Sequence, residues 1–350
     1  MSVKRGKEII IFISLFTTLT FKFYPYKIQV IGYTVIIFAA ILDYFIGDPI
    51  YLLHPVQVIG WVISYFAKLA NTFYHDPISQ RLAGVVLSII VVIGSGIIPQ
   101  VIIHTTESVN LFLGIGLQVV ILSSCFAGRS LRNAAIEVLK PLEKGDLSTA
   151  RYILRNYVGR DTENLTKTGI LRATLETVTE NATDGVIAPL LYAILGAIIP
   201  GVEPVTLAMA YKASSTLDSM IGYLHEPYTH LGWFSANLED RLTWLPCRLN
   251  ILTLSIIARK PMAVWQTCCR DAKKDPSPNS GWSECGYASI LGVQVGGINW
   301  YNGTAKYKPL LGDPTHPITT KSIYQALDLT RYSFFVWLGI SSLLLVFGKI

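Results

Sequence analysis

The stretch Arg172-Ala-Thr-Leu-Glu-Thr-Val-Thr-Glu-Asn-Ala-Thr-Asp-Gly185 carries Glu176, Glu180 and Asp184 at steps of four residues. On a helix this spacing puts the three carboxylates on one face, one turn apart. Like charges so placed repel each other, which predicts a positive partner. Mg²⁺ suits the pattern because it combines a few carboxylates with substrate phosphates. The alternative is a solvated acidic face, but the strongly apolar segment that follows favours a metal site beside a membrane.

The composition predicts a membrane protein. Of the 350 residues, 51% are hydrophobic and only 15% are charged, and the mean hydropathy is +0.44; about a quarter of the residues of a soluble domain are charged. We therefore expect an all-α, polytopic integral membrane helical protein with a cytoplasmic helical segment and with membrane lipid as a partner. The net charge of +6 does not predict nucleic-acid binding, because the Lys and Arg residues lie between apolar runs, as in cytoplasmic loops.

Apolar runs and charge clusters divide the chain into six segments. We expect an N-terminal extension or anchor (1–36), membrane helices with an interfacial helix (37–127), a cytoplasmic helical region (128–185), a membrane hairpin with polar motifs (186–258), a cytoplasmic loop region (259–332) and a C-terminal membrane helix (333–350). The positive-inside rule then predicts a multi-pass protein of the cell (inner) membrane whose active site faces the cytoplasm. The regions Gly128–Asp184 and Arg259–Lys274 are both predicted to be cytoplasmic, which is inconsistent with a full crossing at Trp244–Ala258 after the predicted hairpin. Either that run lies in or on the membrane without crossing it, or the predicted hairpin is wrong.

Two charged residues stand in apolar company within Val205–Tyr223. Lys212 and Asp218 are too polar to face lipid, so they should face a protein interior or a cavity. If the segment from 186 to 223 is a hairpin, Asp218 returns to the membrane side of Asp184, and the two can share one cation. A structural Lys–Asp pair inside the bundle is the alternative.

The residues alone leave two classes of function open. One is an Mg²⁺-nucleotide or Mg²⁺-diphosphate enzyme, including a membrane prenyltransferase, in which carboxylates hold the metal and cations clamp phosphates. The other is a membrane transporter that uses Lys212 and Asp218 as midplane residues. The clustering of charged motifs in polar segments, and the lack of paired inverted halves, count against transport.

Several motifs, taken together and in order, resemble one family. They are Leu42–Gly60, Ala127–Leu131, Val158–Thr162, Glu176–Pro189, Leu207–Ala213, Thr216–Tyr223 and Ser277–Asn279. This pattern, spread from Ile37 to Pro314, resembles the CobD/CbiB family, the adenosylcobinamide-phosphate synthases of cobalamin biosynthesis. The extension before about residue 35, Ser214-Ser215 and Glu239-Asp240-Arg241 depart from the usual family pattern.

The resemblance implies a reaction. The family joins a corrinoid, adenosylcobyric acid, to (R)-1-amino-2-propanol or its O-phosphate by an ATP-dependent amide bond, which gives adenosylcobinamide or its phosphate. By analogy with other ATP-driven amide ligases, we expect an acyl phosphate intermediate. ATP and Mg²⁺ are the expected cofactors, and other cobalamin-pathway enzymes are candidate partners.

The charge pattern and the resemblance together select the candidate site. The catalytic candidates are Glu176, Glu180, Asp184, Lys212 and Asp218. The candidates for binding substrate or phosphate are Arg129, Arg160, Asp161, Asn181, Asp48 and Asn279. Glu180, Asp184 and Asp218 are the expected metal ligands, and Glu176 is expected to orient metal-bound water or to act as the base for the amine. For Arg160 and Asp161, which share a predicted turn, a local ion pair is the alternative. Trp282 and Tyr287 are candidates for stacking on the corrinoid, with ordinary packing as the alternative.

Overall fold

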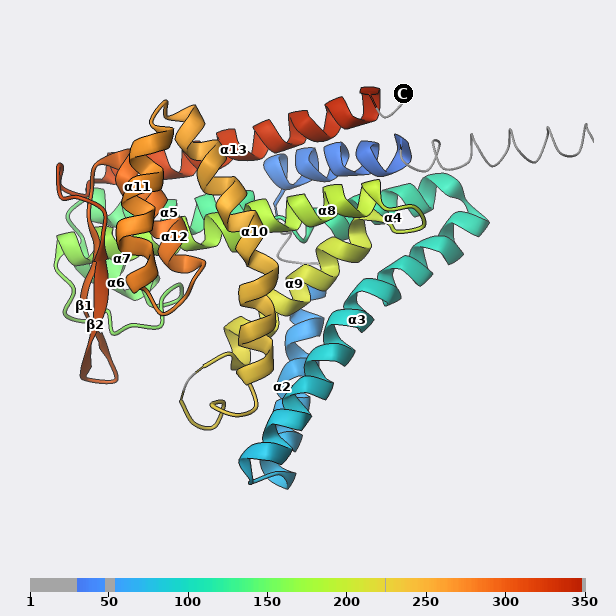
Figure 1. Cartoon of the computed structure of the whole chain (residues 1–350), viewed down its shortest axis with the longest axis horizontal. Coiled ribbons are helices and arrows are strands. Elements are labelled where there is room, and N and C mark those ends of the chain that lie inside the picture. Colours follow the sequence, from blue (N-terminus) through green and yellow to red (C-terminus); the bar gives the residue numbers. More distant parts are fainter. Residues whose placement is uncertain (1–29, 48–53, 224, 348–350) are drawn as a thin grey trace, which may run out of the picture.

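The computed structural model describes residues 30–47, 54–223 and 225–347, and these form a helical protein with one β-hairpin (Figure 1). The helices are Val30–Phe45, α2 (Pro55–Phe73), α3 (Pro77–Val109), α4 (Leu111–Ser123), α5 (Gly128–Glu143), α6 (Leu147–Leu154), α7 (Lys167–Asn181), the π-helical turn η1 (Ala182–Ile187), α8 (Ala188–Ile198), α9 (Pro204–Ile221), α10 (Trp233–Ile257), α11 (Pro261–Asp271), the 3₁₀ turn η2 (Ala272–Lys274), α12 (Ser280–Leu291) and α13 (Thr320–Phe347). The antiparallel strands β1 (Val295–Tyr301) and β2 (Thr304–Leu311) form the hairpin, which the sequence did not predict.

Three stretches of the described chain are long and apolar enough to cross a membrane. They are Pro77–Val109, Leu111–Glu143 and Lys167–Ile198. The first is α3, whose 33 residues extend over about 50 Å, more than the roughly 30 Å of bilayer hydrocarbon. The prediction of an all-α membrane protein is therefore confirmed.

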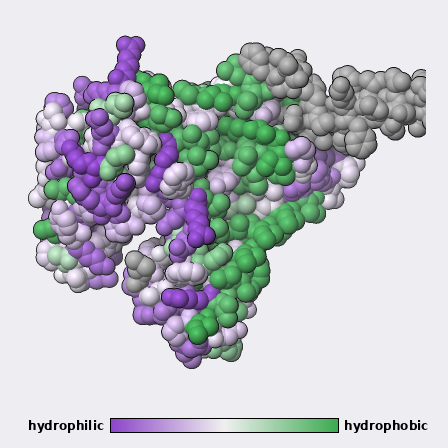
Figure 2. Space-filling model, in the orientation of Figure 1, coloured by the Kyte–Doolittle hydropathy of each residue, from purple (hydrophilic) through white to green (hydrophobic). Residues whose placement is uncertain are grey.

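The surface separates by polarity along the molecule (Figure 2). A hydrophobic band follows α3, and most of the lobe that holds α11, α12 and the hairpin is hydrophilic. On α3, large apolar side chains such as Ile90, Ile93 and Ile98 are exposed. An apolar face left open to the surroundings is what a helix in lipid presents.

The acid-rich stretch lies at the centre of the fold. α7 passes through η1 into α8, so the expected boundary at residue 185 falls inside one helical run. That run belongs to the candidate span Lys167–Ile198, and α5 belongs to the candidate span Leu111–Glu143. α5, α10, α12 and α13 all contact α7 or η1.

The predicted hairpin that follows the acidic stretch is present. α8 and α9 pack against each other around a turn in which Gly201 has a φ of +80°, a conformation that favours glycine. The run Trp244–Ala258 lies almost wholly in α10, which is not among the three candidate spans of the described chain. The expected N-terminal anchor lies mostly in residues 1–29, outside the described residues.

Candidate functional site

Glu180 and Asp184 belong to a cluster of charged groups drawn from three helical segments. Asp184, on η1, interacts electrostatically with Glu180, with Asp218 and Lys212 of α9, and with Glu239 of α10. The α8–α9 hairpin therefore brings Asp218 and Asp184 together as the sequence analysis expected. The carboxylates in this cluster outnumber its one lysine.

Glu239 is the member of the cluster to which the sequence analysis gave no role. Its side chain is buried and accepts a hydrogen bond from the Thr243 hydroxyl one turn further along α10. Thr243 also shares a hydrogen bond of 2.8 Å with the Tyr211 hydroxyl, and the Tyr211 ring stacks on Tyr192 at a centroid distance of 4.9 Å. The only sequence signal was a pair of acidic residues, Glu239 and Asp240, just before an apolar run.

The donor chemistry of this cluster suits Mg²⁺. Within residues 30–47, 54–223 and 225–347, no group of three or more His, Cys, Asp or Glu side chains is arranged to hold a metal ion. Mg²⁺ does not need such a group, because it commonly uses one or two carboxylates and completes its octahedron with water and substrate phosphates. Carboxylates that repel one another around Asp184 provide hard oxygen ligands for such a cation.

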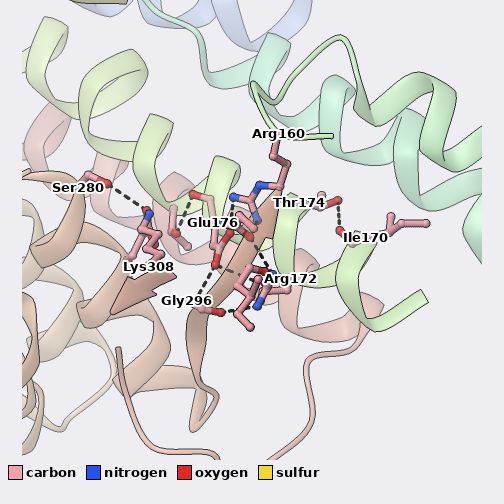
Figure 3. Close-up of polar contacts among 12 residues, drawn as sticks. Arg160, Ile170, Arg172, Thr174, Glu176, Ser280, Gly296 and Lys308 are labelled. Atoms are coloured by element: carbon pink, nitrogen blue, oxygen red, sulfur yellow. Dashed lines mark hydrogen bonds and ion pairs between the residues drawn. The ribbon is translucent and has the colours of Figure 1, made fainter. Parts of the chain in front are cut away.

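Glu176, the first carboxylate of the acidic stretch, has different surroundings. Its side chain is almost fully buried, and one of its oxygens lies 2.5 Å from a guanidinium nitrogen of Arg160. The other oxygen accepts a hydrogen bond of 2.8 Å from the backbone N–H of Gly296 and lies 3.9 Å from Nε of Arg172 (Figure 3). Both oxygens are therefore engaged by the protein, which favours a structural role for Glu176.

The predicted turn containing Arg160 and Asp161 fastens the hairpin to α7. Arg160 donates a hydrogen bond of 3.0 Å to Oδ1 of Asn299 on β1. Asp161 accepts hydrogen bonds from the backbone N–H groups of Asn302, at 3.0 Å, and Gly303, at 2.8 Å. Arg160 and Asp161 therefore both bond to the hairpin. The structure shows these contacts in place of the Arg160–Asp161 ion pair that was the alternative.

Lys308, on β2, is a cation that the sequence analysis missed. Its ammonium lies 2.6 Å from Oε1 of Glu284 and 3.9 Å from Oδ2 of Asp275, and it also interacts electrostatically with Glu180 and Glu176. Burial alone would lower the pKa of Lys308, but Glu284, Glu180 and Glu176 outweigh burial and raise it. Lys308 therefore stays protonated and connects the hairpin to Glu284 of α12 (Figure 3).

The two candidate asparagines, Asn279 and Asn181, form hydrogen bonds with other groups of the protein. Asn279 is buried, donates a hydrogen bond of 2.8 Å to the backbone oxygen of Asp240 and accepts one of 2.6 Å from Arg248. It therefore joins the loop before α12 to α10. Asn181 is exposed and donates a hydrogen bond of 2.9 Å to the backbone oxygen of Thr177, one turn earlier in α7.

The remaining candidates lie elsewhere. Arg129 is exposed at the start of α5 and donates a hydrogen bond of 2.8 Å to the backbone oxygen of Tyr44. Asp48 lies outside the described residues. Trp282 and Tyr287 are both buried, and the Tyr287 hydroxyl lies 2.6 Å from Oγ1 of Thr330, so the two rings serve the packing of α12.

Comparison with protein families matches residues 36–330 to the family described as CobD/Cbib protein. The chain belongs to the CobD/CbiB family. The match includes all eleven of the candidate site residues and ends within α13. Most of the 1–36 segment lies outside the CobD/CbiB match, as the resemblance led us to expect.

Three CobD/CbiB relatives give the degree of similarity. A cobalamin biosynthesis protein CobD of Synechocystis sp. is 49% identical over 311 residues, which cover 88% of this chain and 91% of the relative. A protein of the same name from Halalkalibacterium halodurans is 37% identical over 84% of this chain and 90% of its own length. The cobalamin biosynthesis protein CbiB of Salmonella typhimurium is 38% identical over 83% of this chain and 90% of its own length. No solved structure matches the chain.

Proposed function

We propose that this chain is a cobalamin biosynthesis enzyme that joins adenosylcobyric acid to (R)-1-amino-2-propanol, or to its O-phosphate, at the expense of ATP. Its membership of the CobD/CbiB family and the names of its relatives support the pathway and a corrinoid substrate. The observation that carries the proposal is the cluster in which Asp184 interacts with Glu180, Asp218, Glu239 and Lys212. Such a cluster suits a reaction in which a metal-bound nucleotide meets a second anion.

The chemistry explains why ATP is needed. A carboxylate is a poor acyl donor, because its leaving group would be an oxide ion. Transfer of the γ-phosphoryl group of ATP to the substrate carboxylate forms an acyl phosphate and releases ADP. The amine nitrogen then attacks the carbonyl carbon, the bond to the phosphate oxygen breaks, inorganic phosphate leaves, and the nitrogen loses a proton to give the amide.

The described residues divide the work between them. Two of the three expected ligands Glu180, Asp184 and Asp218 would hold Mg²⁺, which when bound supplies positive charge to the ATP phosphates. Lys212 offsets the negative charge of the transferring phosphoryl group. Glu239, oriented through its hydrogen bond with Thr243, is the carboxylate we assign to receive the amine proton.

The other candidates act by positioning. Glu176 holds the hairpin against α7 through Arg160 and Gly296, and the hairpin in turn places Lys308 beside Glu180. We therefore assign Glu176 a positioning role in place of the expected base. The hydrophilic lobe would face the cytoplasm of a cell (inner) membrane protein, where ATP is available.

The test is a reaction with the purified full chain in detergent. Adenosylcobyric acid, ATP and Mg²⁺ are combined with aminopropanol or its O-phosphate, and ADP and the new corrinoid are followed by mass spectrometry. We expect Asp184→Asn to lower the rate by at least about 100-fold, as loss of one charge-stabilising group commonly does. Asp146→Asn is the matched control, because Asp146 caps α6 away from the cluster and Asn is an equally good helix cap.

Each outcome bears on a different part of the proposal. An amide product from the wild type and the control, but not from Asp184→Asn, supports both the reaction and the cluster as its site. An amide product from all three keeps the reaction and refutes the role of Asp184. No amide product from the wild type with either amine refutes the proposed reaction.

A further inference from the structure

A cavity of about 340 Å³ lies between Val30–Phe45, α5 and α13, apart from the carboxylate cluster. Val186 of η1 forms part of its wall, whereas Asp184 interacts with groups on α9 and α10. The two sites therefore approach η1 from different sides. The steps assigned above give this cavity no role, although its lining residue Arg129 is one of the candidates for binding substrate or phosphate.

The cavity gathers positive charge. Three of its lining residues are arginines, Arg129 and Arg132 of α5 and Arg331 of α13, and within residues 30–47, 54–223 and 225–347 Asp43 is its one lining carboxylate. Arg132 also pairs with Asp328, which is outside the lining, at 3.0 Å. Among the residues that the structure describes, three guanidinium groups thus meet two carboxylates, an excess of one positive charge. An unbalanced charge in a partly enclosed site is costly, so the site favours an anion.

The arginines are held in place from the protein side. Arg129 donates to the backbone oxygen of Tyr44 at 2.8 Å, and the guanidinium carbon of Arg331 lies 4.9 Å from the centroid of the Tyr44 ring. Neither contact consumes the positive charge. A guanidinium fixed in this way loses little conformational freedom on binding and still has N–H groups to offer.

The backbone adds to the preference for an anion. α5 begins at Gly128 without a side-chain cap and without an acidic residue in its first turn. A Cβ atom added at Gly128 would lie 2.8 Å from Oδ2 of Asp43, so one carboxylate already rests against this helix start. The positive end of the α5 dipole thus lies at the cavity, because Gly128 is one of its lining residues.

We propose that this cavity binds a phosphate group through Arg129, Arg132 and Arg331. Guanidinium groups match phosphate because two parallel N–H donors can meet two oxygens. The group can come from an anionic phospholipid or from a soluble phosphomonoester. Basic pockets between membrane helices bind anionic lipid headgroups, and the aromatic lining residues Phe334 and Phe335 would suit the apolar part of a lipid. This proposal stands whether or not the proposed reaction is correct.

The experiment compares four forms of the full chain in detergent: wild type, Arg331→Gln, Arg331→Lys and Arg155→Gln. Arg155 is an exposed arginine at the end of α6, outside the cavity, so its exchange controls for the loss of one positive charge. Binding of phosphatidylglycerol is measured by native mass spectrometry against phosphatidylcholine. Binding of inorganic phosphate and of aminopropanol O-phosphate is measured by the thermal stabilisation that each produces.

We expect wild type and Arg155→Gln to bind one of the phosphate-bearing probes. Arg331→Gln should bind the same probe at least about tenfold more weakly, which is the loss of affinity expected when a charge-assisted contact is removed. Arg331→Lys should recover part of the loss, because it keeps the charge without the paired donors. A response to phosphatidylglycerol alone identifies a lipid site, and a response to the soluble probes alone identifies a phosphomonoester site. The proposal is wrong if no probe binds, or if all four forms bind every probe equally.

Discussion

The ion pair between Arg160 and Glu176 offers a direct test of whether Glu176 serves stability and not catalysis. Exchange of Arg160 for Gln removes the closest cation from a carboxylate that is 2% exposed. Breaking a buried ion pair by removing one partner commonly costs about 3–5 kcal/mol, because the other charge stays buried. Glu176 keeps the N–H of Gly296 and the more distant Arg172. We therefore expect the loss to lie near about 3–4 kcal/mol.

The loss can be converted into a melting temperature. An unfolding entropy of about 2.1 cal/mol/K per residue gives about 0.74 kcal/mol/K for 350 residues. A loss of about 3–4 kcal/mol then lowers Tm by about 4–5 °C. Glu176→Gln should have a comparable effect, because it leaves the Arg160 guanidinium buried at 9% exposure without its carboxylate.

The assay is thermal unfolding in detergent of the wild type, both single variants and the double variant. Because the two groups act as a pair, the double variant should be more stable than the sum of the single losses predicts, by about 0.5–3 kcal/mol. Losses that simply add would show that the two side chains are uncoupled. A Glu176→Gln protein with unchanged Tm and no activity would refute the structural role and restore Glu176 as a catalytic candidate.

Two further predictions concern stability outside the site. Burial alone would raise the pKa of Asp271, but hydrogen bonds from Arg270 and Lys274 outweigh it and lower the pKa to about 2. The stability that these hydrogen bonds contribute is present above the pKa of Asp271 in the unfolded chain, about 4, and is lost as the pH falls from about 4 to about 2. The difference in Tm between wild type and Asp271→Asn should therefore shrink over that range. Because Arg270 and Lys274 are half exposed, we expect Asp271→Asn to lose only about 1–2 kcal/mol of stability at neutral pH. A Tm difference between the two proteins that persists at a pH of about 2 would contradict this reasoning. Gly84→Ala should destabilise the protein by about 1–3 kcal/mol, because the added Cβ would meet a backbone carbonyl between α9 and α10. Gly116→Ala should not destabilise it, because its Cβ would meet nothing within 4 Å. Equal Tm values for the two variants would contradict this prediction.

The different surroundings of neighbouring carboxylates have a functional consequence. Glu176, Glu180 and Asp184 follow one another at steps of four residues. Glu176 is neutralised by Arg160, whereas Asp184 lies among other carboxylates. One end of the acidic stretch thus secures the hairpin, and the other end keeps an excess of negative charge. A variant series along one helix can therefore separate stability from activity.

Much of the fold could be predicted from local sequence. Long apolar runs predicted the helices α3 and α8, and the four-residue spacing predicted a helix through the acidic residues, of which Glu176 and Glu180 lie in α7 and Asp184 in the π-helical turn η1. These features depend on hydropathy and on the 3.6-residue period, which are properties of a short stretch of chain. The return of Asp218 toward Asp184 also followed, because a short turn between two helices leaves little choice of geometry.

The tertiary structure alone decided which charges are paired. Gly296 reaches Glu176 across 120 residues of sequence, and Asn299 reaches Arg160 across 139. Lys308 comes from a strand whose pattern gave no sign of contact with an acidic helix. A helical period specifies the direction in which a side chain points, but the charge that meets it there belongs to another segment. The sequence by itself therefore determined the membrane helices and the acidic face, and packing between distant segments determined which carboxylates are neutralised and which stay available.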